Sequence, residues 1–561
     1  MSNRQVTLGL PCGLALLALA ATQARAEMLV WTAPATTRVQ PEDAPTADRQ
    51  IAISAARNEW EPFQVIVTAR GASLSGVRVE ASALVARRDL IDRDNIHLLR
   101  QHYIQVTRPS ARCDTPPGWW PDALIPFENP IQAPDREPDD PPRPFGPAKY
   151  RAQPFDVEAG KNQPIWGEVW VPPEARPGLY EARVTVRARR AEATVPIALT
   201  VRDFVLPWPP SVQSDFGSVA RAAPQHGLKA SDPAFQVIEA RYHAEMILHR
   251  IMPAAPARCH PTPLPDGSID TSESHAILKY YIEEFGLNSL RLQRSMPYKD
   301  PLGADRATAV KYLRNLYSYL EANGWADMAY IYVRDEPNDA EAYEYVRERA
   351  ALIHEASPKF NVLCTEQTIT SNPEWGDLYG AVDTWVPLWA LYDEPTAAER
   401  LARGEKLWGY TALCQGREPS PYWQLDFPAL NYRVPLWINW RYGMTGLLYW
   451  TTVYWAQTPD PWTDPVTYGR DRSRGYNCEG SLFYPGAQVG FDGPVASIRL
   501  KMIREGMEDY EYLKLLADRG GKDLADETAR AIGRSWFAWD TDPAHLMAAR
   551  ERIAAAIEAA G

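Results

Sequence analysis

The stretch Ala-Tyr-Ile-Tyr-Val-Arg-Asp-Glu-Pro, residues 329–337, decides how the fold is interpreted. A β-prone run ends there in two adjacent carboxylates, Asp335 and Glu336, and Pro337 stops the run. Proline also disfavours a helical conformation of the residue before it, so we expect Glu336 to be extended. The catalytic residues of a (β/α)₈ barrel lie at the C-terminal ends of its strands. The stretch therefore predicts a buried strand that delivers both acids to a barrel mouth.

Patterns on either side of this stretch alternate between strand and helix, which favours parallel strands joined by crossover helices. Eight segments are strand candidates: 214–219, 250–252, 289–292, 329–333, 361–365, 384–387, 407–411 and 446–451. Helix patterns lie between them, for example at 307–323 and 340–356. About eight such units over residues 210–493 have the size of a TIM-type (β/α)₈ barrel.

The rest of the chain predicts two further units. Residues 27–209 contain short runs of alternating polar and apolar residues separated by turn signals, which predicts an antiparallel β-sandwich. A proline-rich linker at 206–210 separates this unit from the barrel. Residues 494–561 have helical periodicity and predict a helical cap on the barrel. The fold class is thus a multidomain β plus α/β protein.

The N-terminus has the pattern of an export signal. Residues 1–26 contain a basic residue, an apolar run and Ala-Arg-Ala as a cleavage site, which is typical of a secretory signal peptide. The apolar run is too short for a membrane span, and no second long apolar stretch follows. We expect an exported protein, in the periplasm or outside the cell.

Composition excludes several classes of partner. The net charge is −12, so no basic surplus is present to neutralise nucleic-acid phosphates. The nine histidines and six cysteines are scattered and show no zinc-ligand spacing, so neither a metal nor another cofactor is expected. One or two disulfides are possible after export. The 20 tryptophans and 27 tyrosines suit either a large core or platforms on which sugar rings stack.

The spacing of the acid pair restricts its chemistry. Retaining glycosidases usually hold two carboxyl groups about 5–5.5 Å apart across the scissile bond, and inverting enzymes about 6.5–9.5 Å apart. Adjacent residues such as Asp335 and Glu336 do not easily flank one bond from opposite sides, because their Cα atoms are about 3.8 Å apart. They suit substrate assistance, in which one carboxyl protonates the leaving oxygen and the other orients an acetamido group. The competing structural interpretation is that both acids stabilise a helix N-terminus.

Further candidate substrate contacts come from the last predicted strands. Trp450 and Trp455 follow the final strand and are candidates for the wall and floor of a sugar subsite. Tyr410 ends the preceding strand and is a candidate hydrogen-bond partner of a ring substituent or an acetamido oxygen. Trp385 and Arg433 complete the predicted substrate-binding set. Ordinary core packing is the alternative for all the aromatic residues.

Six stretches give the chain a recognisable signature. They are 56–64 (Ala-Arg-Asn-Glu-Trp-Glu-Pro-Phe-Gln), 177–180, 335–337, 446–450, 480–486 and the long run 497–513. In these stretches the chain resembles glycoside hydrolase family 123 and the broader group that shares its catalytic domain. The resemblance implies a retaining β-N-acetylgalactosaminidase that uses substrate assistance. It further implies that Glu336 is the acid/base and that Asp335 steadies the acetamido nitrogen.

Two alternatives stay open. The substrate could lack an acetamido group, in which case Glu366 or Asp383 is the candidate nucleophile. The chain could instead be a carbohydrate-binding protein without catalysis. In every case a glycan or glycoconjugate is the expected partner, and the oligomeric state is open. The charged residues within 497–513 are expected to form salt bridges rather than to take part in chemistry.

Overall fold

The computed structural model describes residues 1, 26–131, 143–189, 191–293, 295–370, 372–413, 415–416, 418–470 and 475–561. The predicted signal peptide therefore lies almost entirely outside the described residues. Among the described residues, no helix has the length and apolarity required to cross a membrane. The domain limits 27–209, 210–493 and 494–561 stay predictions.

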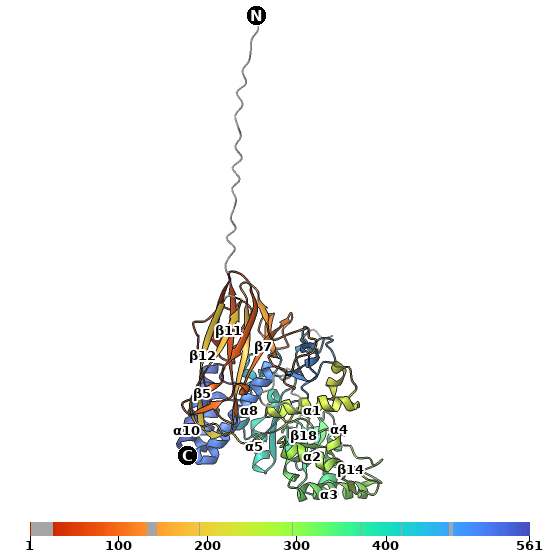
Figure 1. The fold of residues 1–561 in the computed structure, drawn as a ribbon. Coiled ribbons are helices and arrows are strands. Elements are labelled where there is room, and N and C mark those ends of the chain that lie inside the picture. Colours follow the sequence, from red (N-terminus) through yellow and green to blue (C-terminus); the bar gives the residue numbers. More distant parts are fainter. Residues whose placement is uncertain are drawn as a thin grey trace.

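The N-terminal part of the chain folds into two β-sheets (Figure 1). The first sheet contains, in spatial order, β1 (Glu27–Ala33), β3 (Glu59–Arg70), β10 (Asn162–Val171), β7 (Ile96–Val106) and β8 (Gly118–Pro126). The second contains β2 (Ile51–Arg57), β12 (Ala191–Val205), β11 (Gly178–Ala188), β4 (Leu74–Ala81) and β9 (Phe155–Val157), with β5 (Leu84–Ala86) beside β11 and β6 (Asp89–Ile91) beside β5.

The inner faces of the two sheets share one hydrophobic core. Val65 and Val169 from the first sheet pack in the same cluster as Val184 and Leu199 from the second. This is the packing of a β-sandwich, in which alternate side chains of each strand point inward. One detail corrects the expected antiparallel arrangement: β2 and β12 pair in parallel.

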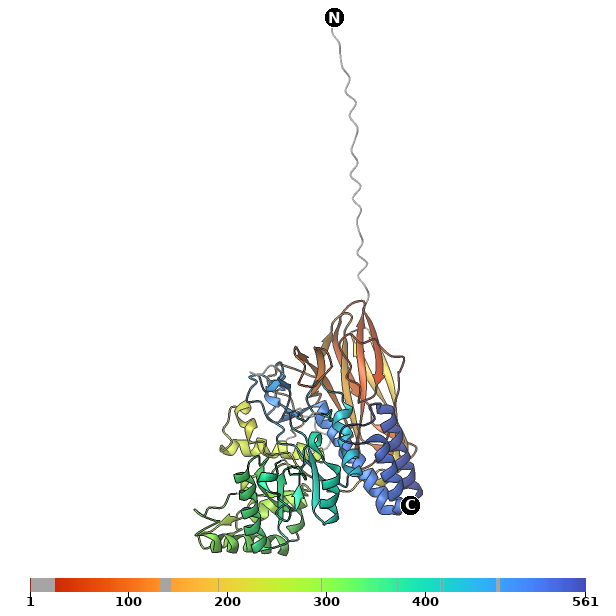
Figure 2. The same ribbon diagram turned by 180° about the vertical axis from the view of Figure 1, so that it is seen from behind.

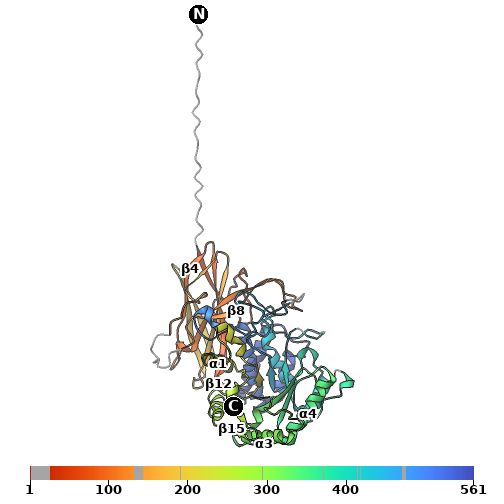
Figure 3. The ribbon, with the colours of Figure 1, turned by 90° about the vertical axis from the view of Figure 1, so that its right-hand side faces the viewer.

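The central part of the chain builds one seven-stranded, nearly closed parallel sheet. Its strands, in spatial order, are β13 (Gln213–Asp215), β21 (Gly446–Leu448), β20 (Lys406–Tyr410), β19 (Thr384–Trp385), β18 (Asn361–Thr365), β17 (Ala329–Asp335) and β16 (Leu290–Leu292). The α-helices that lie between β13 and β21 in the chain are α1 (Pro233–Leu248), α2 (Ser274–Glu283), α3 (Arg306–Ala322), α4 (Ala340–Ala356), α5 (Glu394–Ala402), α6 (Leu430–Arg433) and α7 (Pro435–Arg441). Figure 3 shows α3 and α4 on the side of the molecule away from the β-sandwich.

The sheet departs from a regular (β/α)₈ barrel at two places. The predicted strand at 250–252 is wrong, because these residues form no strand. The segment nevertheless runs beside β13, since the Phe216 amide donates to the Met252 carbonyl at 2.9 Å and the Ala254 amide donates to the Gly217 carbonyl at 3.0 Å. In addition, β18 and β19 are connected without an α-helix, through the 3₁₀ turn η5 (Pro373–Trp375).

Short two-stranded antiparallel sheets lie outside the parallel sheet. They are β14 (Thr262–Pro263) with β15 (Ile269–Asp270), β22 (Val466–Tyr468) with β23 (Tyr476–Asn477), and β24 (Phe483–Pro485) with β25 (Pro494–Ala496). The 3₁₀ turn η2 (Ala220–His226) follows β13.

Three C-terminal helices connect the two halves of the molecule. They are α8 (Ile498–Leu516), α9 (Lys522–Ile532) and α10 (Pro543–Ala559), drawn in blue below the sandwich in Figure 2. Helix α8 contacts α6, α7 and β8, whereas α10 contacts α8 and β12. The helices therefore contact the sandwich as well as helices α6 and α7 beside the barrel-like sheet.

Buried ion pairs hold α8 in this position. Arg499 of α8 pairs with Asp122 of β8 at 3.0 Å, and neither side chain is exposed. Lys501 and Arg504 reach Glu168 of β10 at 2.8 and 3.0 Å. A buried charge without a partner is costly, so these pairs fix the helix against the sandwich. The prediction that the charges of 497–513 are structural is supported.

Candidate active site

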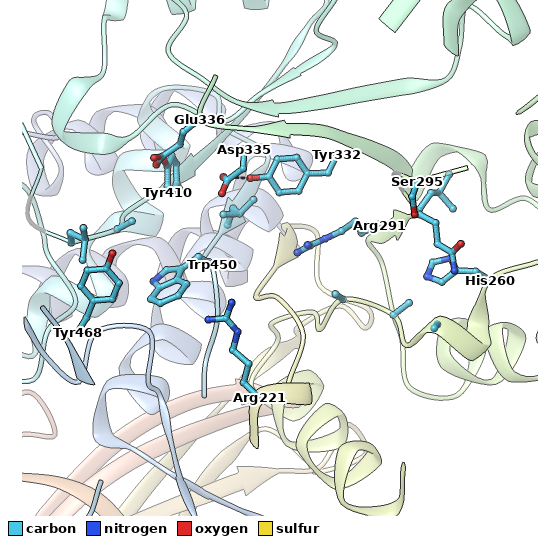
Figure 4. A pocket seen from close by; sticks show the side chains of 18 of the residues that line it. Arg221, His260, Arg291, Ser295, Tyr332, Asp335, Glu336, Tyr410, Trp450 and Tyr468 are labelled. Carbon is cyan, nitrogen blue, oxygen red and sulfur yellow. Dashed lines mark hydrogen bonds between the residues drawn. The ribbon is translucent and has the colours of Figure 1, made fainter. Parts of the chain in front are cut away.

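A cavity of about 940 Å³ opens at the C-terminal ends of the parallel strands. Asp335 and Glu336 line it, as the sequence predicts, together with Tyr410 and Trp450 (Figure 4). The other lining residues are Arg221, Ala254, Ala255, Ala257, His260, Arg291, Leu292, Gln293, Ser295, Tyr332, Ala412, Leu413, Gln415, Leu448 and Tyr468.

A bulge in β17 aims Asp335 at this cavity. Side chains of a regular strand alternate between its two faces, so Asp335 would share a face with Ile331 and Val333, which pack in the core outside the sheet. The pairing with β18 shifts, however: Tyr332 lies opposite Leu363, but Arg334 lies opposite Cys364. The extra residue reverses the alternation, so Asp335 points to the same side as Tyr332.

Two hydroxyl groups hold one oxygen of Asp335. Tyr332 donates to Asp335 Oδ1 at 2.6 Å, and Thr365 Oγ1 donates to the same atom at 2.9 Å. Burial, together with the Asp335 carboxylate, raises the pKa of Tyr332 well above its usual value, so this hydroxyl stays a donor. Within the described chain Asp335 Oδ2 accepts no hydrogen bond, and it remains available to a ligand.

Glu336 is held by its backbone and by one phenol. Its amide donates to Thr365 Oγ1 at 3.0 Å, and Tyr410 donates to its Oε1. Its φ of 42° places it in the left-handed region, which corrects the prediction of an extended residue. That conformation is uncommon for a residue other than glycine, and such strain concentrates at functional sites. Burial and the Glu336 carboxylate raise the pKa of Tyr410 well above its usual value, which keeps Tyr410 protonated.

Trp450 forms an aromatic wall of the cavity, and a buried acid fixes its indole. Trp450 Nε1 donates to Glu479 Oε1 at 2.8 Å, while Tyr449 donates to the same oxygen at 3.3 Å and Gln424 donates to Oε2. Glu479 is fully buried, which raises its pKa. The Tyr468 ring meets the Trp450 ring edge-on at 6.1 Å, so the wall continues onto β22.

Two arginines form another wall, from η2 and β16. Arg221 lies over the rings of Trp450 and Tyr454, at 5.9 and 5.2 Å from their centres. Arg291 lies over Tyr332 at 5.4 Å and donates from both Nε and Nη2 to the buried Asp215 carboxylate. Figure 4 shows both guanidinium groups directed toward the space near Asp335 and Trp450.

Three of the predicted substrate contacts lie elsewhere. Trp455 is buried and donates to Ser481 at 2.8 Å, and Trp385 is buried and donates to Glu405. Arg433 forms a buried pair with Asp509 of α8 at 2.6 Å. None of the three lines the cavity. The structure therefore corrects their predicted role: these side chains pack inside the protein.

The two alternative nucleophiles are also outside the cavity. Asp383 precedes β19, at the opposite end of the parallel sheet from Asp335, and bonds His354 at 2.9 Å. Glu366 follows β18 and accepts from the Gln367 amide at 2.8 Å. Burial, followed by the nearby Glu336 carboxylate, raises the pKa of Glu366 to about 7.

The histidine, cysteine and acidic side chains of the described residues bear on the predictions about metals and disulfides. No group of three or more histidine, cysteine, aspartate or glutamate side chains is arranged there to hold a metal ion. Cys113, Cys259, Cys364 and Cys478 are free thiols. Cys414 lies outside the described residues.

Several residues that line the cavity, and one that supports its wall, were missed by sequence reasoning. Tyr332 lies in the stretch 329–337, two residues after Tyr330. Residues two apart in a strand share a face, so this spacing could have placed Tyr332 on the inner face of the sheet with Tyr330. Arg291 lies within the short strand β16 and Arg221 in the turn after β13, but a single arginine in a short segment carries no distinctive pattern. Glu479 precedes a recognised motif, yet nothing in the sequence connects it to Trp450.

Comparisons with known proteins agree with this architecture. The catalytic-domain model of glycoside hydrolase family 123 matches residues 303–516, and the N-terminal-domain model of the same family matches residues 35–188. A solved family 123 glycoside hydrolase from Clostridium perfringens, from a study of glycolipid glycan hydrolysis, has a TM-score of 0.67 at 13% identity. That alignment covers 95% of this chain and 98% of the other.

Other similarities are remote. A GH2 β-galacturonidase from Eisenbergiella tayi has a TM-score of 0.30 at 10% identity, covering 80% of this chain and 71% of its own. A comparison with curated proteins gave no match. The two family models together span both halves of the molecule, and the acid pair lies within the catalytic match. The chain belongs to glycoside hydrolase family 123.

Proposed function

We propose that this protein hydrolyses β-linked N-acetylhexosaminides, with N-acetylgalactosamine as the expected sugar, and that it retains the anomeric configuration by substrate assistance. One observation carries the proposal: adjacent Asp335 and Glu336 line one cavity, and each has one oxygen fixed by a phenol. The second oxygen of each acid is left for a substrate. Two acids on the same side of a bond suit assistance by the substrate itself.

In the first step Glu336 acts as a general acid. Its carboxyl proton passes to the glycosidic oxygen as the bond from C1 to that oxygen breaks. The acetamido carbonyl oxygen of the same sugar attacks C1 and forms an oxazolinium ring. Asp335 Oδ2 accepts a hydrogen bond from the acetamido N–H, so the carboxylate stabilises the positive charge that develops on that nitrogen.

In the second step Glu336, now ionised, acts as a general base. It takes a proton from a water molecule, whose oxygen attacks C1 and reopens the ring. The two inversions at C1 give net retention, and Glu336 regains its proton. Tyr410 orients Glu336 in both steps, while Trp450 offers an apolar face on which a pyranose ring can stack.

A comparison of paired aryl glycosides tests the proposal. The enzyme is expected to release 4-nitrophenol from the β-N-acetylgalactosaminide, and to leave the matching β-galactoside, which lacks the acetamido group, essentially uncleaved. NMR of the first-formed sugar should show the β anomer. Preferential cleavage of the glycoside without an acetamido group, or an α product, would contradict substrate assistance.

Variants of the acid pair complete the test. Glu336→Gln should lower kcat most for glycosides with poor leaving groups, because these depend most on proton donation. Asp335→Asn should lower kcat by a factor of about 100 or more. The matched control is Glu348→Gln, since Glu348 is exposed in the middle of α4. Unchanged kinetics in Asp335→Asn would remove the assigned role of Asp335.

We further propose that the protein is exported, because residues 1–26 have the pattern of a cleavable signal. N-terminal sequencing of the protein recovered from outside the cytoplasm is expected to begin at Glu27. A cytoplasmic protein with an intact N-terminus would overturn this proposal.

A further inference from the structure

We propose that the wall formed by Arg221 and Arg291 binds an acidic group of the glycan, a carboxylate or a sulfate ester. This inference rests on the proposed function, because it identifies the class of substrate that the same cavity takes. The acidic group belongs either to the cleaved sugar or to its aglycone, and the two sources share the chemistry of an oxyanion with several acceptor oxygens.

Arg221 brings a positive charge to the cavity that no acidic side chain of the described residues neutralises. No ion pair to Arg221 occurs within the described residues, and its guanidinium is instead placed by the rings of Trp450 and Tyr454. Stacking of this kind occupies the face of the guanidinium and leaves its N–H donors at the edge free. Those donors form a fork that fits a carboxylate or sulfate with two parallel hydrogen bonds.

Arg291 differs from Arg221 in its charge balance. Its Nε and Nη2 are used by Asp215, which is fully buried and also accepts from Tyr330 at 2.5 Å. This pair fixes Arg291 and cancels most of its charge. Arg291 therefore acts as a rigid neighbour that adds Nη1 as a further donor, while Arg221 supplies the net positive charge.

In the described part of the chain, the other ionisable groups that line the cavity supply no second positive charge. Burial lowers the pKa of His260, so this ring is neutral near pH 7. Asp335 and Glu336 are the remaining lining acids, and both already accept from tyrosine hydroxyls. The Asp335 carboxylate repels a second anion, so an acidic glycan needs a nearby cation to enter the cavity. A cavity of about 940 Å³ has space for a substituent beyond the sugar that contacts the acids.

Two pairs of glycosides test the inference. The first pair is an aryl β-N-acetylgalactosaminide and its 6-O-sulfate, and the second pair is β-linked N-acetylgalactosamine carried by glucuronic acid and the same sugar carried by glucose. In at least one pair, the wild-type enzyme is expected to show a kcat/KM at least tenfold higher for the acidic member than for the neutral member. The compound that shows the preference reveals whether the acid lies on the sugar or on the aglycone.

Arg221→Gln is then expected to reduce kcat/KM for the preferred acidic glycoside by about ten- to a hundredfold more than for the neutral one. Arg221→Lys should restore part of the preference, because it keeps the charge but loses the fork. Arg314→Gln is the control, since Arg314 is an exposed arginine on α3 and does not line the cavity.

The possible outcomes distinguish failure of the acidic-group site from failure of the proposed glycosidase activity. Turnover of the neutral glycoside without any preference for an acidic one would overturn the acidic-group site alone. An equal loss on neutral and acidic glycosides in Arg221→Gln would show a general sugar contact and would also overturn it. Absence of turnover for all the glycosides would overturn the proposed function and this inference together.

Discussion

Tyr332 and Asp335 lie three residues apart on β17, yet the Tyr332 hydroxyl donates to Asp335 Oδ1 at 2.6 Å. In a regular strand, residues separated by three point to opposite faces of the sheet. The register shift between Tyr332 and Arg334 removes this opposition. The bulge thus converts two residues of one strand into a donor and an acceptor on the cavity side, and it makes the orientation of Asp335 dependent on Tyr332.

Loss of the Tyr332 hydroxyl should therefore weaken the orientation of Asp335. In Tyr332→Phe we expect kcat for an N-acetylgalactosaminide to fall about tenfold, which corresponds to about 1.5 kcal/mol for a hydrogen bond to a charged group. KM should change less, because the lost interaction acts on the developing charge. Steady-state kinetics check this, with Tyr345→Phe on α4 as control. A raised KM at unchanged kcat would assign Tyr332 to ground-state binding instead.

The buried acid behind Trp450 should control substrate affinity. Glu479→Gln replaces an acceptor of several hydrogen bonds by an amide that must also donate, so Trp450 loses its fixed orientation. We expect KM to rise about tenfold, with a shift in tryptophan fluorescence. Glu405→Gln is the matched control, because Glu405 accepts from Trp385 outside the cavity. Equal effects of both variants on KM would refute a positioning role for Glu479.

Glu366 should make the folded protein less stable as pH rises. Its pKa of about 7 exceeds the ordinary value of 4.5, so between these values the unfolded chain releases a proton that the folded chain keeps. The free energy of unfolding then falls with rising pH, by about 3 kcal/mol in total. Glu366→Gln should be more stable than wild type at pH 8 and equally stable at pH 4, as measured by urea unfolding. A variant less stable at pH 8 would show that the carboxylate is favourable where it lies.

The pair between α8 and the sandwich should contribute strongly to stability. Arg499→Met leaves Asp122 buried with fewer compensating donors, and we expect a loss of about 3–5 kcal/mol in urea unfolding. Arg552→Met removes a pair with Glu527 in which both side chains are exposed, and it should cost less than about 1 kcal/mol. Similar losses in the two variants would mean that burial of the Asp122 pair adds nothing.

The positions of the acids were predictable because they depend on chain order. A β-prone run that ends in Asp335 and Glu336 places them at a strand's C-terminal end, whatever the details of the sheet. The orientation of Asp335 was not predictable, because a bulge depends on pairing with β18, which lies about 30 residues further along the chain. The left-handed conformation of Glu336 was not predictable for the same reason. The preference for an extended residue before proline takes only Pro337 into account.

Aromatic residues show where sequence reasoning stops. Trp450 and Trp455 both follow the last strand, but one lines the cavity and the other is buried against Ser481. Local pattern cannot separate them, since burial of a large ring depends on segments brought together by the fold. The strand expected at 250–252 failed similarly. Three residues can satisfy the pattern of a strand, but whether they join a ladder depends on neighbouring segments, and here they run beside β13 without forming a strand.

The missing strand beside β13 has a consequence for how this enzyme can diversify. Residues Ala254, Ala255, Ala257 and His260, which line the cavity, come from the irregular segment that replaces it. Substitutions or insertions there break no hydrogen-bonded ladder of the seven strands, so they cost little folding free energy. New glycan preferences can therefore arise along this seam while the paired strand that presents the acids stays unchanged.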